Sequence, residues 1–269
     1  MKPSDNVFDA MDEFWVEIAD KNQTDFQLSF LKNHLDVDGR VLDLACGSGR
    51  HLIPLTKAGY DVVGFDVSLN LLRIAKQRLG EAVLVRGDMR FLPFKEGAFK
   101  AIISMDTSFG YLPSEEDDLS CLRDLSWMLK KSGVFIIDVF NRQQLISRYG
   151  HRGFLKSLKW FVLPALVKLR LRRVLFFVFK WREYSSFFLL QRRDLSSDNS
   201  KLCDLWVIFV KSSGRLIRFK HEVRLYGAKH ILNMLSEAGF TMNYLIGGYE
   251  GQAFSDDANR LIISSEVRG

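Results

Sequence analysis

The sequence predicts an α/β protein built on a doubly wound, mostly parallel sheet of seven strands, with a helical and antiparallel β segment inserted as a lid. Five short apolar runs alternate with amphipathic segments between residues 40 and 139, as in parallel sheets that helices cover on both faces. A turn of small residues follows the first run, at a position where open α/β sheets bind ligands. The alternation ends after Asn141, where a different pattern begins.

Length and composition agree with one domain that carries an insertion. The chain has 269 residues, of which 47% are hydrophobic, enough to build a full core. We expect residues 1–142 and 227–269 to form the core domain, with residues 1–36 as an N-terminal helical cap. We expect residues 143–226 to supply the inserted basic helical segment and an antiparallel sheet, as a lid and substrate region.

The elements of the first half follow from apolar spacing and from residues that start or stop helices. Residues 7–35 have apolar side chains at helical spacing and are expected to form one or two helices. A further helix is expected to begin after its N-cap Ser68 and to stop at Gly80. The strands of this half are expected at residues 40–45, 61–66, 82–85, 99–105 and 134–139.

A longer helix is expected to start at Ser114, where Asp117 completes a capping box. Lys130 and Lys131 are expected to close this helix, since cations favour a helix C-terminus. Beyond the basic segment, polar and apolar residues alternate as in antiparallel strands. The later elements are expected to be strands at 186–193, 202–211 and 215–225, a helix at 228–238 and a closing hairpin of 240–246 with 260–265.

The ligand site is predicted at the turn after the first strand, which has the sequence Asp43-Leu44-Ala45-Cys46-Gly47-Ser48-Gly49-Arg50. Two glycines one residue apart allow backbone angles and a close approach that a side chain would block. Asp66 follows Gly47 by 19 residues, at the end of the second strand, where a carboxylate accepts hydrogen bonds from ribose hydroxyls. Leu52 stands where a dinucleotide fingerprint needs a third small residue. Asp43 suits a ligand with an ammonium and a sulfonium better than one with phosphates.

Three features occur in order along the chain: the motif D-x-A-C-G-S-G-R, Asp66 and the pair Asp88-Met89. In this combination the sequence resembles the class I, Rossmann-like S-adenosylmethionine-dependent methyltransferases of small-molecule type. The resemblance covers roughly residues 38–142 and 228–266. It implies S-adenosyl-L-methionine (AdoMet) as the cofactor, with Asp88 at the adenine amine and Met89 against the adenine ring, and no metal. The cofactor-binding residues under this resemblance are Asp43, Ala45, Gly47, Gly49, Asp66, Val67, Asp88, Met89 and Asp106.

Methyl transfer from a sulfonium requires an acceptor atom held about 3 Å from the methyl carbon, on the side opposite sulfur. A base is needed only when the acceptor must first lose a proton. His221, near the end of the inserted sheet, and Tyr111, in the loop after the fourth strand, are the candidate catalytic residues. For each of them an ordinary structural role is the alternative interpretation.

The net charge of +6 is concentrated in one segment. From Val139 to Arg182 there are eleven Lys and Arg residues and no Asp or Glu, so the remainder of the chain is net acidic. Residues 153–182 combine these cations with large apolar side chains, in uncharged runs too short to span a bilayer. Three interpretations stay open: a lid over the active site, peripheral contact with an anionic membrane and, less favoured, a nucleic-acid contact.

The predicted function is transfer of a methyl group from AdoMet to a small-molecule acceptor, with an apolar or membrane-derived acceptor as one form of this hypothesis. The alternatives are an RNA or protein methyltransferase that uses the basic insertion, and a non-catalytic AdoMet-binding or membrane-associated scaffold. Asp106-Thr107-Ser108-Phe109 stands where amino-methylating enzymes of nucleic acids and proteins often carry Asn-Pro-Pro-Tyr. This difference disfavours base N-methylation.

The three cysteines are scattered and form no C-x-x-C pair, so they indicate neither a disulfide framework nor a zinc site. The first residues lack the basic region and apolar run of a secretory signal. We therefore expect a cytoplasmic protein, with a peripheral position at the membrane as the alternative.

Overall fold

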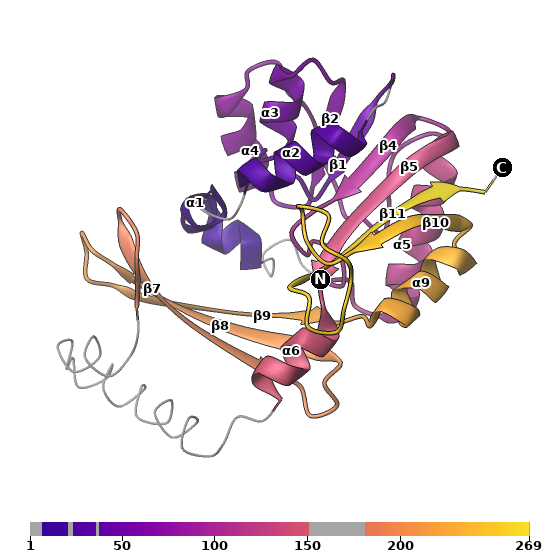
Figure 1. Ribbon diagram of the computed structural model, residues 1–269. Helices are drawn as coiled ribbons and strands as arrows, with labels where there is room; N and C mark the ends of the chain where they lie inside the picture. The colour runs from indigo at the N-terminus through magenta and orange to yellow at the C-terminus, as the bar shows by residue number, and fades with distance from the viewer. Residues whose placement is uncertain (1–6, 21–23, 36–37, 151–180, 269) are drawn as a thin grey trace. The chain divides into compact units, whose positions relative to one another are not determined.

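The computed structural model describes residues 7–20, 24–35, 38–150 and 181–268. Most of the predicted basic segment, residues 153–182, thus lies outside the described residues. The chain divides into two compact units, one of residues 1–144 with 224–269 and the other of residues 145–223 (Figure 1). The larger unit holds the glycine turn, and the smaller unit holds most of the second sheet.

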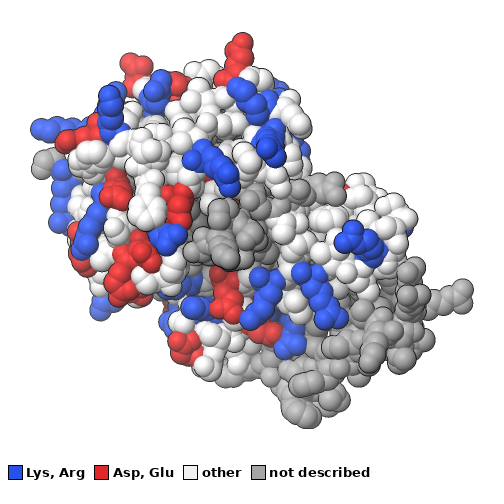
Figure 2. Space-filling view, turned by 180° about the vertical axis from the view of Figure 1, so that it is seen from behind, with Lys and Arg blue, Asp and Glu red and all other residues white. Residues whose placement is uncertain are grey.

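Charged side chains of both signs share the surface seen in Figure 2. On that face the described Lys and Arg side chains are interspersed with Asp and Glu side chains. Among the described residues, no helix has the length and hydropathy needed to cross a bilayer.

The sheet of the larger unit has seven strands in the order β10-β11-β5-β4-β1-β2-β3. β1 pairs in parallel with both β2 and β4, and the two outer pairs β2·β3 and β4·β5 are also parallel. β11 runs antiparallel to β5 and to β10, which confirms the predicted mostly parallel, seven-stranded sheet. The strands are β1 Val41–Leu44, β2 Val62–Asp66, β3 Val83–Arg86, β4 Phe99–Ser104, β5 Leu129–Phe140, β10 Phe240–Ile246 and β11 Arg260–Val267.

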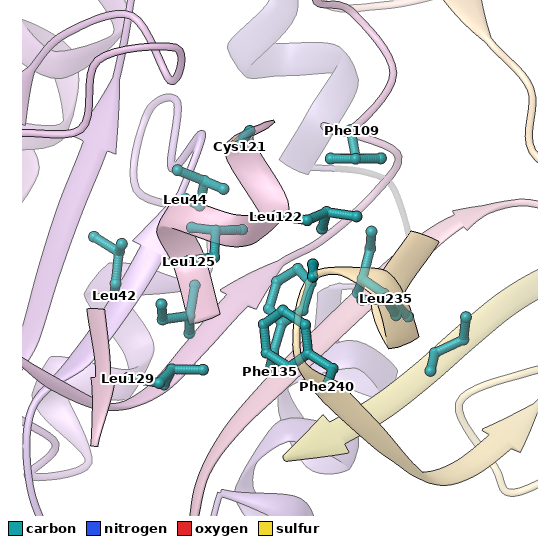
Figure 3. Packing of buried hydrophobic residues seen from close by; sticks show 14 of the residues in the cluster. Leu42, Leu44, Phe109, Cys121, Leu122, Leu125, Leu129, Phe135, Leu235 and Phe240 are labelled. Carbon is teal, nitrogen blue, oxygen red and sulfur yellow. The ribbon is translucent and has the colours of Figure 1, made fainter. Parts of the chain in front are cut away.

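The larger unit has two separate cores, to which four of its described helices contribute buried residues. The cores are separate because successive strand residues point to opposite faces of the sheet. The bounds of the helices are α1 Val7–Asp20, α2 Thr24–His34, α3 Leu52–Lys57, α4 Leu69–Arg78, α5 Glu115–Met128 and α9 Ala228–Glu237. The first core packs α5 and α9 against one side of the strands (Figure 3), and its members include Leu42, Leu44, Cys121, Leu122, Leu125, Phe135, Ile231 and Leu235. The second core packs α2 and α3 against alternate strand residues, and it includes Leu28, Leu31, Val41, Leu52, Leu55, Ala101, Ile103 and Ile136.

The start of α5 agrees with the prediction, and its end does not. The Ser114 side chain accepts the Asp117 N–H at 3.0 Å, and the Asp117 carboxylate accepts the Ser114 N–H at 3.0 Å, which completes the capping box. Lys130 does not extend the helix, because the chain leaves it at Met128 and Leu129 already pairs with Phe99 of β4. The buried Leu129 side chain joins the first core, so a tertiary strand contact overrides the local signal for a helix end.

The second sheet is antiparallel and has the order β6-β7-β8-β9. Phe187 pairs with Val210 at one end of β7·β8, and Leu195 pairs with Leu202 at the other. The helix α6, Arg142–Tyr149, ends just before residues 151–180, and β6 lies outside the predicted strands. The strands are β6 Arg182–Glu183, β7 Phe187–Leu195, β8 Lys201–Val210 and β9 Leu216–Arg224.

Gly64, in the middle of β2, provides a test of the packing beneath the glycine turn. A Cβ at this position would lie 2.6 Å from Leu52 Cδ1 and 2.8 Å from both Cys46 Sγ and Leu84 Cδ2. Gly64→Ala should therefore lower the free energy of unfolding by about 1–3 kcal/mol, the usual cost of overpacking a core. The measurement is urea denaturation followed by circular dichroism.

Gly80→Ala is the matched control, since nothing lies within 4 Å of a Cβ added there. Its free energy of unfolding should change by about 0.5 kcal/mol or less. Equal losses in the two variants would contradict the steric explanation.

Candidate functional site

The turn after β1 is a tight, left-handed stretch of backbone. Ala45, Gly47 and Gly49 have φ values of 60°, 54° and 82°, a region that L side chains rarely adopt. A Cβ added to Gly49 would also come within 3.0 Å of Ile53 and 3.3 Å of Ala75. The small residues of the motif are therefore required by the path of the chain as well as by any ligand.

Asp66 fixes this turn from the end of β2. Its Oδ2 accepts the Gly47 N–H at 2.8 Å, and its Oδ1 accepts the Ser68 N–H at 2.8 Å. Ser68 in turn caps α4 by accepting the Leu71 N–H at 3.2 Å. One buried carboxylate thus joins the ends of two parallel strands. The apolar Val67 side chain beside it is 43% exposed.

Asp43 lies beneath the turn. The residue is 1% exposed, and its Oδ2 accepts the Leu52 N–H at 3.1 Å, at the start of α3. Burial raises the pKa of this carboxyl to about 7, against an opposing effect of the nearby Arg50 charge. Asp43 thus accepts a hydrogen bond from the backbone at the start of α3.

Asp88 and Met89 follow β3, whose neighbour is β2. The Asp88 carboxylate accepts hydrogen bonds from Arg90, with Arg90 Nη2 at 2.5 Å from Oδ2, and this pairing lowers the pKa of Asp88. Met89 is partly buried and packs against the first core. In the structure as it stands, a ligand amine would have to share the Asp88 carboxylate with Arg90.

Asp106, after β4, lies in a strained backbone. It and Thr107 have φ values of 56° and 62°, which is uncommon for consecutive residues other than glycine. Two hydrogen bonds hold them: the Asp106 N–H donates to Asp138 Oδ2 at 2.9 Å, and the Thr107 N–H donates to the Asp138 carbonyl at 2.9 Å. The loop conformation therefore depends on Asp138 of β5.

Asp138 is the centre of a buried network. Arg260 Nε donates to Asp138 Oδ1 at 2.6 Å, while Arg260 Nη2 donates to Thr107 Oγ1 at 2.8 Å. The Tyr249 hydroxyl donates to Asp138 Oδ2. Burial and the Asp138 charge raise the pKa of Tyr249, so this hydroxyl keeps its proton. Three groups from distant parts of the chain, the Asp106 N–H, the Tyr249 hydroxyl and the Arg260 guanidinium, are thereby fixed to one carboxylate.

Arg50, the last residue of the motif, connects this network to the N-terminal helices. Its Nη2 donates to Asp106 Oδ2 at 3.1 Å, and its Nη1 contacts Gln27 Oε1 and Thr24 Oγ1 of α2. The ring of His51 is 3.0 Å from the same Gln27 oxygen. Gln27 also donates to the Tyr249 hydroxyl at 2.8 Å, which closes the network.

The structure places the predicted cofactor-binding residues at the carboxyl ends of the parallel strands. The turn residues, Asp66, Val67, Asp88, Met89 and Asp106 all follow the carboxyl ends of β1 to β4, and Asp43 lies below them. Sequence reasoning missed the network residues Gln27, Asp138 and Arg260, and it assigned no such network to Arg50. One signal was available, since Asp138 is an acid within an otherwise apolar strand.

The two candidate catalytic residues lie in different units. Tyr111 is half-buried in the loop after β4 of the larger unit. His221 lies on β9 of the smaller unit, with its ring centroid 5.7 Å from that of Trp206. Burial lowers the pKa of His221, so its imidazole is neutral near pH 7. Among the residues that the structure describes, no group of three or more His, Cys, Asp or Glu could hold a metal ion.

Comparison with known proteins agrees with this geometry. Residues 41–133 match a family model described as a methyltransferase domain. The dTDP-3-amino-3,4,6-trideoxy-alpha-D-glucopyranose N,N-dimethyltransferase of Streptomyces venezuelae is 37% identical over 99 residues, which cover 36% of this chain and 41% of that protein. The glycine/sarcosine N-methyltransferase of Parasynechococcus marenigrum is 34% identical over 143 residues, which cover 49% and 50% of the two chains.

A solved S-adenosylmethionine-dependent methyltransferase from Clostridium acetobutylicum has a TM-score of 0.73 and 18% identity to this chain. The alignment covers 98% of this chain and 100% of that one, and at this identity it shows a shared fold. The chain spans about half the length of the curated relatives it matches. Together, the family match and the shared fold confirm the resemblance to class I methyltransferases that the motifs indicated.

The raised pKa of Asp43 generates a test in the protein without ligand. A carboxyl with a pKa of about 7 in the folded state and 3.8 in the unfolded state stabilises the fold below pH 4, and this contribution is lost as the pH rises through 7. The wild type should therefore lose stability relative to Asp43→Asn between pH 4 and pH 7.5, on the order of 2–4 kcal/mol.

Urea midpoints of both proteins across this pH range provide the measurement. The amide of Asp43→Asn cannot ionise, so the common background of other titrating groups cancels in the difference. A difference that is constant with pH would contradict a raised pKa at Asp43.

Proposed function

We propose that this chain, whose residues 41–133 match a methyltransferase-domain model, transfers a methyl group from AdoMet to a small-molecule acceptor. The observation that carries the proposal is the left-handed glycine turn, which the Asp66 carboxylate fastens to the end of β2. This turn places backbone without side chains and a carboxylate together at the carboxyl ends of β1 and β2. A nucleoside ligand needs both of these groups.

The charges at this edge suit a cationic ligand. Asp66, Asp88, Asp106 and Asp138 lie at or near the carboxyl ends of β2, β3, β4 and β5. Arg90, Arg50 and Arg260 are the cations paired with the last three of these carboxylates. A pyrophosphate would meet mainly carboxylates here, whereas AdoMet brings a sulfonium and an ammonium. Opposite charges at such short range attract even at intermediate dielectric constants.

The arrangement gives each part of the cofactor a proposed position. Asp66 accepts hydrogen bonds from the ribose hydroxyls, and the exposed Val67 side chain packs against the adenine. The Asp88 carboxylate accepts a hydrogen bond from the adenine amine, and Arg90 gives up one of its own hydrogen bonds to this carboxylate. Met89 lies against the adenine ring. Gly47 and Gly49 keep the turn bare, so the backbone can approach the amino-acid end of the cofactor.

The transfer step needs alignment more than a reactive side chain. The acceptor atom attacks the methyl carbon while the carbon–sulfur bond breaks, and sulfur leaves as a neutral thioether. An amine acceptor then loses a proton to water or to a base. Tyr111 and the neutral His221 stay the candidates for that base, and each is described within its own unit.

The acceptor class we propose is a small molecule with a free amino or hydroxyl group. The named relatives act on an amino sugar nucleotide and on glycine or sarcosine. An apolar or membrane-derived acceptor stays a prediction, because the basic segment that suggested it lies outside the described residues. On the face shown in Figure 2, the described basic side chains are interspersed with acidic ones, and they form no continuous basic surface there.

Incubation with methyl-labelled AdoMet and a panel of small acceptors tests the proposed activity. The panel contains amino sugar nucleotides, glycine and hydroquinones, and mass spectrometry detects products heavier by one methyl group. Formation of both a methylated product and S-adenosylhomocysteine from one panel member supports the proposal. Saturable AdoMet binding without transfer to any small acceptor, together with labelling of RNA or protein, would contradict it.

Asp66→Ala tests the ribose contact. Loss of a charged hydrogen-bond acceptor should weaken AdoMet binding by about 1–3 kcal/mol, which is roughly 5-fold to 150-fold in Kd. Isothermal titration calorimetry measures the effect. Asp61→Ala is the control, because Asp61 precedes the same strand and forms an exposed ion pair with Arg40. Unchanged affinity in Asp66→Ala would mean that the ribose lies elsewhere.

A further inference from the structure

We propose that Arg224 is a positioning residue for methyl transfer, which fixes the loop of residues 110–114 in the conformation that receives the acceptor. Loss of its guanidinium should therefore impair turnover of the acceptor and spare binding of the donor. The inference rests on the proposed function, and it assigns a role to a residue outside the glycine turn and the carboxylates described above.

Arg224 binds the backbone of this loop at several successive points. It is the last residue of β9, where the chain returns to the larger unit. Its own N–H donates to the Gly110 carbonyl at 2.9 Å. Its guanidinium donates to the carbonyls of Leu112 at 3.4 Å, Pro113 at 3.2 Å and Ser114 at 3.1 Å. One residue thus holds four of the five carbonyl groups of the loop.

The direction of the guanidinium is fixed by Asp118, in the first turn of α5. Asp118 forms an ion pair with Arg224 and accepts the Tyr226 hydroxyl at 2.6 Å. The side chains of Asp118 and Arg224 are 0% and 13% exposed. A buried ion pair of this kind contributes little net stability, but a planar guanidinium donates its hydrogen bonds in fixed directions. Asp118 therefore orients the arginine, and the arginine orients the loop.

Both ends of the loop are also held by other contacts. At its start Phe109 is buried, with its ring centroid 5.8 Å from that of Tyr226, and Gly110 has a φ of 100° that favours glycine. At its end Ser114 caps α5. The half-buried Tyr111, a candidate for the base, lies between these points. The contacts of Arg224 thus fix the backbone that carries Tyr111.

The strand order explains why this loop concerns the acceptor. β4, β1, β2 and β3 are successive neighbours in the sheet. In the proposed function the adenine lies after β3, the ribose after β2 and the amino-acid end at the turn after β1. The donor thereby occupies the carboxyl ends of these three strands. The part of the β4 loop beyond Asp106 is then the next segment that an acceptor meets as it approaches the methyl group.

Arg224→Lys separates the geometry of this residue from its charge. A lysine keeps a positive charge beside Asp118 but lacks the planar fork that spans three carbonyls. For the panel acceptor that the wild type methylates, we expect kcat/KM at saturating AdoMet to fall 10-fold or more. The Kd for S-adenosylhomocysteine should stay within twofold of the wild type, which also shows that the variant folds. Arg123→Lys is the control, because Arg123 forms an exposed ion pair with Glu237, and it should match the wild type in both measurements.

Gly110→Ala disturbs the same loop without changing the guanidinium or Asp118. A side chain is strained at its φ of 100°, so we expect the same pattern of lower kcat/KM and retained affinity for S-adenosylhomocysteine. Gly59→Ala is the matched control. Gly59 has a φ of 93°, nothing lies within 4 Å of an added Cβ, and the residue follows α3.

Wild-type turnover in either Arg224→Lys or Gly110→Ala would overturn the inference while the proposed function stands. Equal losses of kcat/KM and of affinity for S-adenosylhomocysteine would also overturn it, because they would show a general structural role. If Arg224→Lys does not fold, Gly110→Ala decides alone. A wild-type protein that methylates no member of the panel would overturn the proposed function, and the inference with it.

Discussion

The hydrogen bond from the Gly47 N–H to the Asp66 carboxylate is the interaction on which the arrangement of the site depends. It ties the turn after β1 to the end of β2, and the second Asp66 oxygen extends the tie to Ser68 and thus to α4. The left-handed turn residues and the crowded Gly49 follow from this path. The strand edge is thereby formed before any ligand arrives, which reduces the cost of ordering it on binding.

A second buried carboxylate, that of Asp138 on β5, holds the loop that follows β4. Asp138 and Arg260 form an ion pair whose side chains are 0% and 13% exposed. Such a pair contributes little net stability, because removing two charges from water costs about as much as their attraction returns. Its clear consequence is geometric: it fixes the Asp106–Thr107 loop and connects it to Tyr249, Gln27 and the N-terminal helices.

The sequence allowed prediction of features with local causes. The Ser68 cap, the Ser114–Asp117 capping box, the glycine turn and the alternation of strands and helices each depend on residues within a few positions of one another. The Asp138 network could not be predicted this way, since Arg260 and Tyr249 lie more than 100 residues beyond Asp138. Similarly, Leu129 begins a strand because it pairs with Phe99 across the sheet, a contact that the cations after it do not reveal.

The carboxylates of the strand edge also bear on how a methyl donor would be released. Without ligand each is already satisfied: Asp66 by two backbone N–H groups, Asp88 by Arg90, and Asp106 by Arg50. A ligand must therefore exchange partners with the protein, and a cationic ligand gains most from the exchange. In the proposed reaction the sulfonium becomes a neutral thioether, so this attraction weakens at the moment of transfer. The internal pairs can then re-form, and the same charges that favour binding of the donor favour departure of the product.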